Sequence, residues 1–264
     1  LTLRDRSGTI EEQGVDDRYS IMQLVAGELA AVVSVVDLAD WQGPTDEANL
    51  KDLRWVGPRA CCHEKLIERV TSHGPVLPAR FATLFSSAQA LLSLLGNNYE
   101  TILQFLNYMA DKEEWAVKGF LDRAKAQKAM FEADARAASL PPPPGLRHLL
   151  EQQIHITIAR ELEQWIGSVA EHIGKNLQGN AVEWRNLKTV PREVPGRELD
   201  MVFNWAFLVE RARRGMFEDE VAKASPDLPK HGLVLELSGP WPPYNFCPSL
   251  TSPEPYRTGA EQVA

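Results

Sequence analysis

The sequence predicts an α+β protein with two domains, and two observations support this prediction. Strand-like and helix-like segments alternate through the first 122 residues, which is typical of helices packed on one face of a sheet. Four consecutive prolines at 141–144 then separate this region from a second one, where a long amphipathic segment precedes short strand-like segments. We therefore expect a ferredoxin-like N-terminal sheet with helices on one face, and a C-terminal domain with a long helix and a small antiparallel sheet.

The N-terminal region opens with a polar stretch, and its first clear element is a strand rich in β-branched residues at 29–36. Gly57-Pro58 is expected to break or kink the helical pattern that follows, and His73-Gly74 to end it. The next predicted elements are a strand at 76–85, one long helix at 88–109 and a strand at 114–122. A ferredoxin-like domain needs one more strand at the front, and residues 1–20 do not contain a clear one.

The second half contains the longest helical pattern of the chain. Residues 123–140 are rich in alanine and basic residues and predict a helix, which PPPPG at 141–145 ends as a stiff polyproline joint. Apolar residues then recur at spacings of three and four from Leu150 to Leu177, which predicts a helix of about 30 residues. The remaining predicted elements are a strand at 180–190, a strand with strict alternation at 199–209, a helix at 211–224 and a strand at 232–239.

These patterns set the expected domain bounds. The ferredoxin-like domain is predicted at 1–122, and the alanine-rich segment and the proline run form a linker at 123–147. The domain with the long helix and the small sheet is predicted at 148–247, and a disordered tail at 248–264.

The composition is that of an acidic globular protein. The 264 residues are 44% hydrophobic and 24% charged, which is enough to bury a core in one large or two modest domains. A net charge of −8 argues against a nucleic-acid partner, because phosphate binding requires a basic surface. Three cysteines, two of them adjacent, do not form a disulfide framework, which favours a reduced cytoplasmic location. We also expect neither a secretory leader nor a membrane span.

Catalytic and metal chemistry find little support in the sequence. ACCHEKLIER places Cys62 beside His63, but neighbours in a helix point about 100° apart, so we favour a packed helix with a buried cysteine and a surface histidine. His148, Glu151 and His155 share one side of the long helix and lack a further ligand, so a solvated face is the favoured interpretation. Neither a phosphate-binding loop nor a nucleophile elbow is present, and we expect no enzyme activity, no cofactor and no metal.

Two segments are candidates for a protein interface. LPARF (77–81) contains Pro78, which indicates an edge strand or a bulge, and an arginine that could bind a partner's carboxylate or form an internal ion pair. SGPWPPYNF (238–246) follows the last predicted strand, which is expected to stop at Ser238-Gly239. The stiff arm beyond it either packs on a neighbouring helix or docks another protein. The candidate interface residues are Arg80, Phe81, Trp241, Tyr244 and Phe246.

Six segments, spread along the chain in a fixed order, carry a resemblance to a known family. They are GELAAVVS, CCHEKLIERV, GPVLPARFATLF, EWAVKGFLD, EWRNLKTVPREVPGRELDMVFNWAFLV and SGPWPPYNF. Together they resemble the gas vesicle protein GvpL/GvpF family over residues 15–247. In that family a helix with a histidine precedes a strand similar to "vlPlrFGtvf", and a later glutamate begins another strand. His63, residues 76–85 and Glu114 match these features.

The chain departs from the family pattern at two places. Ala82 stands where the family commonly has glycine after phenylalanine. The family's opening strand, similar to "YlYGi", is not recognisable, and a trimmed start would leave the N-terminal sheet without an edge strand.

The resemblance implies a non-enzymatic, two-domain α+β accessory protein of gas vesicle formation, located in the cytoplasm and at the gas vesicle. Family members are associated with GvpA, the small hydrophobic shell protein, and with other accessory proteins. These are the implied partners, with neither nucleic acid nor a membrane. An acidic soluble protein can cover the apolar surface of a shell subunit before it polymerises. The alternatives are a minor structural component of the vesicle wall and, in a different class, a small-molecule-sensing or enzymatic α+β protein.

Overall fold

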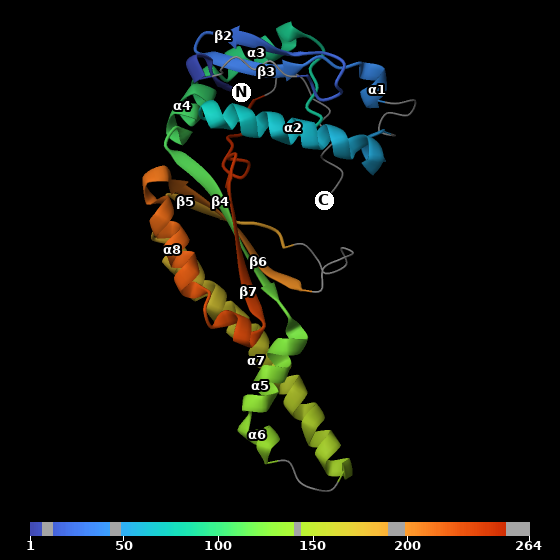
Figure 1. Ribbon diagram of the computed structural model, residues 1–264, viewed down its shortest axis with the longest axis vertical. Helices are drawn as coiled ribbons and strands as arrows, with labels where there is room; N and C mark the ends of the chain where they lie inside the picture. Colours follow the sequence, from blue (N-terminus) through green and yellow to red (C-terminus); the bar gives the residue numbers. More distant parts are fainter. Residues whose placement is uncertain (7–12, 43–48, 140–143, 190–198, 252–264) are drawn as a thin grey trace. The chain divides into compact units, whose positions relative to one another are not determined.

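The computed structural model describes residues 1–6, 13–42, 49–139, 144–189 and 199–251 (Figure 1). The chain divides into two compact units. Unit 1 combines Leu1–Lys112 with Trp241–Ala264, and unit 2 is Glu113–Pro240. The chain therefore passes between the units twice, and unit 1 is assembled from both ends of the sequence.

Unit 1 contains a three-stranded sheet in the order β1-β3-β2. Its strands are β1 (Thr2–Leu3), β2 (Ile21–Ala26) and β3 (Leu29–Ser34), and both outer strands pair with β3 in antiparallel register. The strand predicted at 29–36 is confirmed as β3. The sequence did not predict β2, which reaches β3 through a tight turn at Gly27 (φ +62°). A Cβ at Gly27 would lie 2.7 Å from the hydroxyl oxygen of Tyr99, so the turn also needs glycine for space.

Four α-helices of unit 1 are described. They are α1 (Leu38–Gln42), α2 (Leu53–His73), α3 (Ala88–Asn97) and α4 (Tyr99–Met109), with short 3₁₀ turns at Arg4–Arg6 and Asn49–Lys51. Of the break or kink predicted at Gly57-Pro58, the break is wrong, because α2 continues through Pro58. A proline this close to a helix N-terminus removes a single backbone hydrogen bond, and fifteen further residues continue the helix. The predicted end at His73-Gly74 is confirmed.

Two further predictions for unit 1 are wrong. The single helix predicted at 88–109 is divided at Asn98, which ends α3 and begins α4. The strand predicted at 76–85 is reduced to one bridge between Thr2 and Val76. Pro78 cannot donate to a ladder, and Ala82 has a left-handed backbone (φ +64°) that no regular strand accepts.

Unit 2 is built on a four-stranded sheet in the order β5-β6-β4-β7. Its strands are β4 (Lys112–Leu121, beginning at the last residue of the first segment of unit 1), β5 (Glu183–Asn186), β6 (Asp200–Glu210) and β7 (Leu233–Trp241). The helices α5 (Arg123–Ala133), α6 (Ala135–Ala138) and α7 (Pro144–Gln178) stand between β4 and β5. The helix α8 (Arg214–Ala224), flanked by 3₁₀ turns at Arg211–Arg213 and Leu228–His231, stands between β6 and β7.

The order of these elements corrects the predicted position of the ferredoxin-like arrangement. The mixed helix-and-sheet class is confirmed, but the β-α-β-β-α-β order, with β4 and β6 as central neighbours, occurs in unit 2, and the described residues of the N-terminal region do not show it. The strand predicted at 114–122 is present as β4, and it pairs with strands from the second half of the chain.

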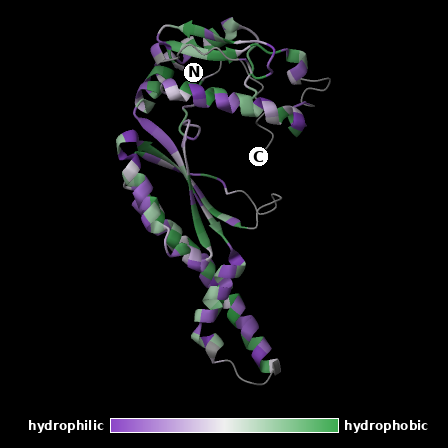
Figure 2. Cartoon of the chain, viewed as in Figure 1, coloured by the Kyte–Doolittle hydropathy of each residue, from purple (hydrophilic) through white to green (hydrophobic). Residues whose placement is uncertain are grey.

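The core of unit 2 lies between this sheet and the helices α7 and α8, which cover one of its faces (Figure 1). The predicted alternation of β6 is confirmed from Met201 to Trp205, where the odd-numbered residues are buried and the even-numbered ones half-buried. It is wrong beyond Trp205, because Ala206 and Leu208 are buried as well. Gly119 makes room for Phe203, because a Cβ there would lie 2.3 Å from its ring. The long helix is confirmed as the 35 residues of α7. Figure 2 shows hydrophobic residues along the strands and a mixture of both kinds on α7.

Candidate protein interface

The central turn of α2 positions the predicted interface residues. The Nε2 atom of His63 lies 3.0 Å from the carbonyl oxygen of Ala79, next to Arg80 and Phe81. The next residue, Glu64, accepts a hydrogen bond of 2.8 Å from the hydroxyl of Tyr244. Successive helix residues point about 100° apart, so the two candidate segments lie on neighbouring faces of α2. The structure thus brings together two segments that are about 160 positions apart in the sequence.

Phe81 anchors its segment in an aromatic cluster that the sequence analysis missed. Its ring centroid lies 5.5 Å from that of Trp41 and 5.7 Å from that of His63. Trp41 is buried and meets Trp55 edge to face at 5.1 Å. The guanidinium of Arg59 lies 4.2 Å from the centroid of Trp55 and covers that ring. Phe81 is therefore half-buried and packs against this cluster, which fixes the turn that carries Arg80.

Arg80 is exposed at a turn. Its carbonyl accepts hydrogen bonds from the backbone N–H of Thr83 (3.2 Å) and from the Thr83 hydroxyl (2.7 Å). Ala82, at the third position of the turn, has the positive φ that glycine adopts without strain. The guanidinium of Arg80 forms no ion pair with any residue that the structure describes, and it extends into solvent. The sequence left two interpretations of Arg80 open, a bond to a partner's carboxylate and an internal ion pair. The internal ion pair is absent from the described part of the chain.

The C-terminal arm, defined as residues 241–251, carries the other three candidates. The strand predicted to stop at Ser238-Gly239 continues to Trp241. Pro242 and Pro243 are then buried, and the backbone carbonyl of Pro242 accepts a 2.7 Å hydrogen bond from the N–H of Tyr244. Trp241 and Tyr244 remain 37% and 38% exposed, whereas Phe246 is half-buried. The arm therefore packs on unit 1 while it presents two aromatic side chains to solvent.

Asn98 fixes the far end of the arm, and the sequence analysis missed it too. Its side chain is buried at the junction of α3 and α4. The amide nitrogen donates to the carbonyl oxygens of Leu94 (2.9 Å) and Thr251 (2.8 Å), and the amide oxygen accepts from the Thr251 N–H (2.8 Å). A buried asparagine in an apolar helical pattern was the available signal, because such a side chain requires hydrogen-bond partners.

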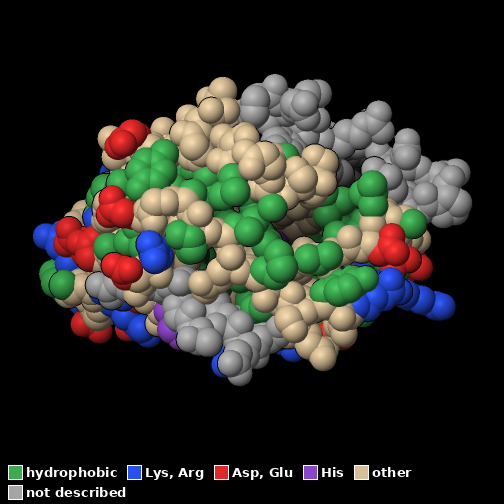
Figure 3. Space-filling model, turned by 90° about the horizontal axis from the view of Figure 1, so that it is seen from above, with side chains coloured by type: hydrophobic (Ala, Val, Ile, Leu, Met, Phe, Trp, Pro, Cys, Tyr) green, Lys and Arg blue, Asp and Glu red, His purple; other side chains and the backbone are tan. Residues whose placement is uncertain are grey.

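Another face of unit 1 also presents apolar side chains. Figure 3 views the molecule from the end where Figure 1 places β2 and β3, and apolar side chains gather near the middle of that face. In this region of the chain Met22, Val25 and Val35 are 44%, 46% and 42% exposed. Gathered apolar side chains of this kind are typical of surfaces that contact other proteins.

The sites considered for catalysis or metal binding do not converge. Cys61 is exposed and Cys62 half-buried, so the expected buried cysteine is wrong, and His63 contacts the Ala79 carbonyl. Glu151 pairs with Arg147 at 2.9 Å, and His155 stacks on Phe131 at 4.7 Å. Within the described ranges, no group of three histidine, cysteine, aspartate or glutamate side chains could hold a metal ion.

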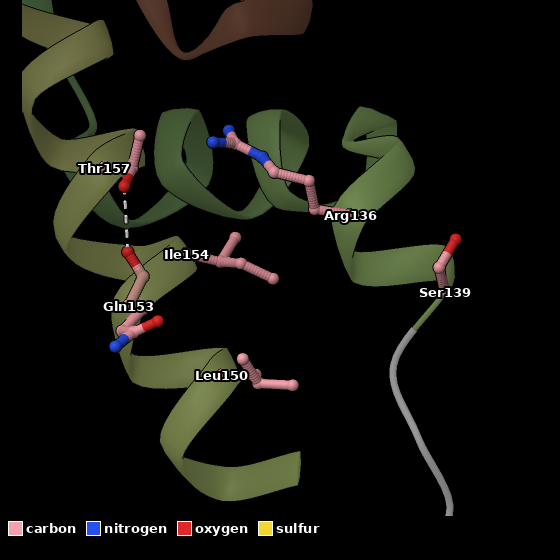
Figure 4. A pocket seen from close by; sticks show the side chains of 6 residues that line it. All are labelled: Arg136, Ser139, Leu150, Gln153, Ile154 and Thr157. Carbon is pink, nitrogen blue, oxygen red and sulfur yellow. Dashed lines mark hydrogen bonds between the residues drawn. The ribbon is translucent and has the colours of Figure 1, made fainter. Parts of the chain in front are cut away.

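A groove of 290 Å³ lies between α6 and α7 of unit 2 (Figure 4). Its described lining consists of Arg136, Ser139, Leu150, Gln153, Ile154 and Thr157. The guanidinium of Arg136 is bonded to Asp134 at 2.6 Å and to Glu161 at 3.4 Å, so two carboxylates already balance its charge. The hydrogen bond to Asp134 is the main reason why the pKa of Arg136 lies above its usual range. The groove therefore offers no acid–base pair among the residues that line it.

The structure also bears on membrane association. No helix in the described part of the chain combines the length and the apolar character needed to cross a membrane.

Comparisons with known proteins identify relatives over nearly the whole chain. The model of the family "Gas vesicle synthesis protein GvpL/GvpF" matches residues 2–248. Gas vesicle protein L of Streptomyces sp. (strain CB03234) is 30% identical over 229 residues, which cover 83% of this chain and 80% of that protein. Gas vesicle protein F of the same strain is 29% identical over 244 residues, covering 88% and 89%.

Solved structures show the same fold. The crystal structure of GvpF from Anabaena sp. PCC7120 matches with a TM-score of 0.65 and 20% identity, and the match covers 94% of each chain. That of GvpF from Microcystis aeruginosa matches with a TM-score of 0.60 and 18% identity, covering 90% of this chain and 93% of the other.

Proposed function

The chain belongs to the GvpL/GvpF family of gas vesicle proteins, and we propose that it acts in gas vesicle formation as a non-enzymatic accessory protein. In this proposal it binds the hydrophobic shell protein GvpA, other accessory proteins, or both, in the cytoplasm at the forming vesicle. The membership of the chain in this family implies the role in gas vesicle formation, and the choice of GvpA as a partner is our proposal.

The choice of the C-terminal arm as the docking surface rests on one observation. Trp241 and Tyr244 keep more than a third of their area exposed, although the arm that carries them is anchored at both ends on unit 1. Tryptophan and tyrosine on a rigid segment contribute much contact area at a small cost in conformational entropy. Arg80 is exposed in the segment that contacts the neighbouring face of α2 through Ala79, and it offers a cation to a partner. These features fit a surface that docks an apolar protein.

The charge of the chain fits the same role. A shell subunit with exposed apolar surface aggregates unless that surface is covered before assembly. A net charge of −8 keeps the covering protein soluble while its aromatic side chains make contact.

Co-purification with GvpA tests this proposal. The double variant Trp241→Ala with Tyr244→Ala is compared with the wild type and with a matched control, Trp184→Ala with Tyr19→Ala. The control side chains are 40% and 47% exposed but lie outside the arm. We expect wild type and control to capture GvpA, and the arm variant to lose at least ~10-fold in affinity, as expected when two aromatic anchors are removed.

Circular dichroism establishes that each variant remains folded. Equal capture by all three proteins would assign the arm to internal packing alone. No capture by any of them would contradict direct binding of GvpA.

A further inference from the structure

The surface that holds the C-terminal arm has the properties of a peptide-binding site. The arm is joined to the rest of the chain at Trp241, and it contacts residues 153 and 180 positions earlier in the sequence. The arm therefore shows what kind of ligand this site binds. The ligand is a segment with prolines and aromatic residues, bound by its backbone at one end and by a tyrosine hydroxyl at the other.

Asn98 makes this site costly to leave empty. Its amide binds both the backbone N–H and the backbone C=O of Thr251, as a neighbouring strand would. These two bonds do not depend on the side chain of the bound residue. Removal of the arm would leave this amide with one of its three hydrogen bonds within the chain, the one to Leu94, and water would have to replace the other two. Because hydrogen bonds made away from water are stronger than exposed ones, the site favours occupation by a backbone segment.

The arm keeps its own shape through local contacts. Pro243 accepts hydrogen bonds from the N–H of Phe246 (3.2 Å) and from the thiol of Cys247 (3.0 Å), in addition to the Tyr244–Pro242 bond. Three prolines from Pro240 to Pro243 further limit the conformations of the detached arm. A segment that is ordered by itself loses little entropy when it binds again.

From these contacts we propose that the site around Glu64 and Asn98 also accepts the C-terminal arm of a second copy of the chain. An exchanged arm makes the same hydrogen bonds as the chain's own arm, so exchange changes few contacts and is opposed mainly by association entropy. The exposed Tyr244–Glu64 bond is weak enough to break, so the arm can detach. The buried contact with Asn98 then stabilises the binding of an arm, whether its own or that of the second copy. This proposal is independent of GvpA binding.

Crosslinking between full-length chains tests the exchange. In a background where Cys61, Cys62 and Cys247 are serine, one chain carries Glu64→Cys and the other carries Tyr244→Cys. The two chains are mixed, incubated and treated with a short bifunctional thiol crosslinker. We expect a covalent heterodimer whose yield rises with protein concentration and is several-fold above that of a control mixture. The control pairs Glu64→Cys with Met216→Cys, an exposed position on α8.

Two further chains make the result decisive. A chain with both Glu64→Cys and Tyr244→Cys should crosslink within itself, which verifies that the two positions meet. Thr251→Pro on the Tyr244→Cys chain removes the N–H that Asn98 binds, and it should lower the heterodimer yield. If the mixed chains yield no more heterodimer than the control while the double-cysteine chain crosslinks internally, the arm stays with its own chain and the proposal is overturned.

Discussion

The hydrogen bonds that hold the arm differ in strength. The bond between Tyr244 and Glu64 is exposed, and such contacts contribute little, since water competes for both groups. The two bonds between Asn98 and Thr251 involve a side chain that is only 5% exposed, where each bond contributes about 1 kcal/mol and an unmade one costs more. Asn98 is therefore the main polar anchor of the arm, and the bond of Tyr244 contributes less to holding it.

A single substitution at Ala82 should increase stability. Alanine in the left-handed region is strained by about 1–2 kcal/mol, and glycine removes that strain at a smaller entropic cost in the unfolded chain. We expect Ala82→Gly to raise the free energy of unfolding by up to about 1 kcal/mol in urea denaturation. Ala159→Gly, inside α7, should lower it by about 0.5–1 kcal/mol. Destabilisation by both changes would show that Ala82 is not strained.

At the element scale, unit 2 depends on a side chain that joins three elements. Arg123, at the start of α5, donates from Nε to Asp200 at the start of β6 (2.5 Å) and from a terminal nitrogen to Glu163 of α7. The hydrogen bond to Glu163 is the main reason why the pKa of this guanidinium lies above its usual range, and burial acts against it. The arginine fork thus ties a helix start, a strand start and the long helix together.

Arg123→Met should therefore cost more than the loss of an ordinary surface charge. Because the side chain is 38% exposed, solvent screening limits the expected loss to about 1 kcal/mol of unfolding free energy. Arg123→Lys keeps the charge but cannot form both bonds, and it should fall between the wild type and Arg123→Met. Lys128→Met, which removes an exposed pair of 3.8 Å to Glu132, serves as the control and should change stability by under about 0.5 kcal/mol. Equal effects at Arg123 and Lys128, measured by urea denaturation, would contradict this account.

Elements whose burial follows a local period could be predicted from the sequence. The alternation in the first half of β6 and the spacing of three and four residues along α7 each record one buried face, and both are confirmed. The second half of β6 is buried on both faces, which the alternation did not predict. The division at Asn98 was missed because the apolar spacing continues across it. The bonds of Asn98 with Thr251 join residues 153 positions apart, which no local period records. The false strand at 76–85 arose because β-branched and aromatic residues there pack in turns and in the Trp41 cluster.

For the candidate site, the residue types could be predicted from the sequence, but the contacts between them could not. Proline and aromatic residues were recognisable at 238–246 because their composition is unusual over a short window. The contacts of Tyr244 with Glu64 and of Phe81 with Trp41 join distant segments, and no local period encodes such pairs.

At the scale of the whole molecule, the order of segments explains the failure to locate the ferredoxin-like arrangement. Its first strand, β4, follows unit 1 directly, and its pairing partners β6 and β7 come from the second half of the chain. A boundary placed by composition after residue 122 therefore assigned β4 to the wrong sheet. Unit 1 in turn depends on residues from the C-terminal end, so unit 1 requires the sequence up to Thr251, whereas unit 2 is one continuous segment.

This dependence predicts a local effect of C-terminal truncation. Deletion of residues 241–264 removes the arm, leaves Asn98 without Thr251 and exposes the surface that Pro242 and Pro243 cover. We expect amide hydrogen exchange to speed up by about 10-fold or more in α3 and α4, which corresponds to the loss of roughly 1.4 kcal/mol of local stability, whereas β6 and α7 keep their protection. Deletion of residues 252–264 alone retains every arm contact described and should leave the exchange pattern unchanged. Unchanged exchange in α3 and α4 after the longer deletion would show that unit 1 folds without its C-terminal segment. Faster exchange throughout unit 2 would contradict a local effect.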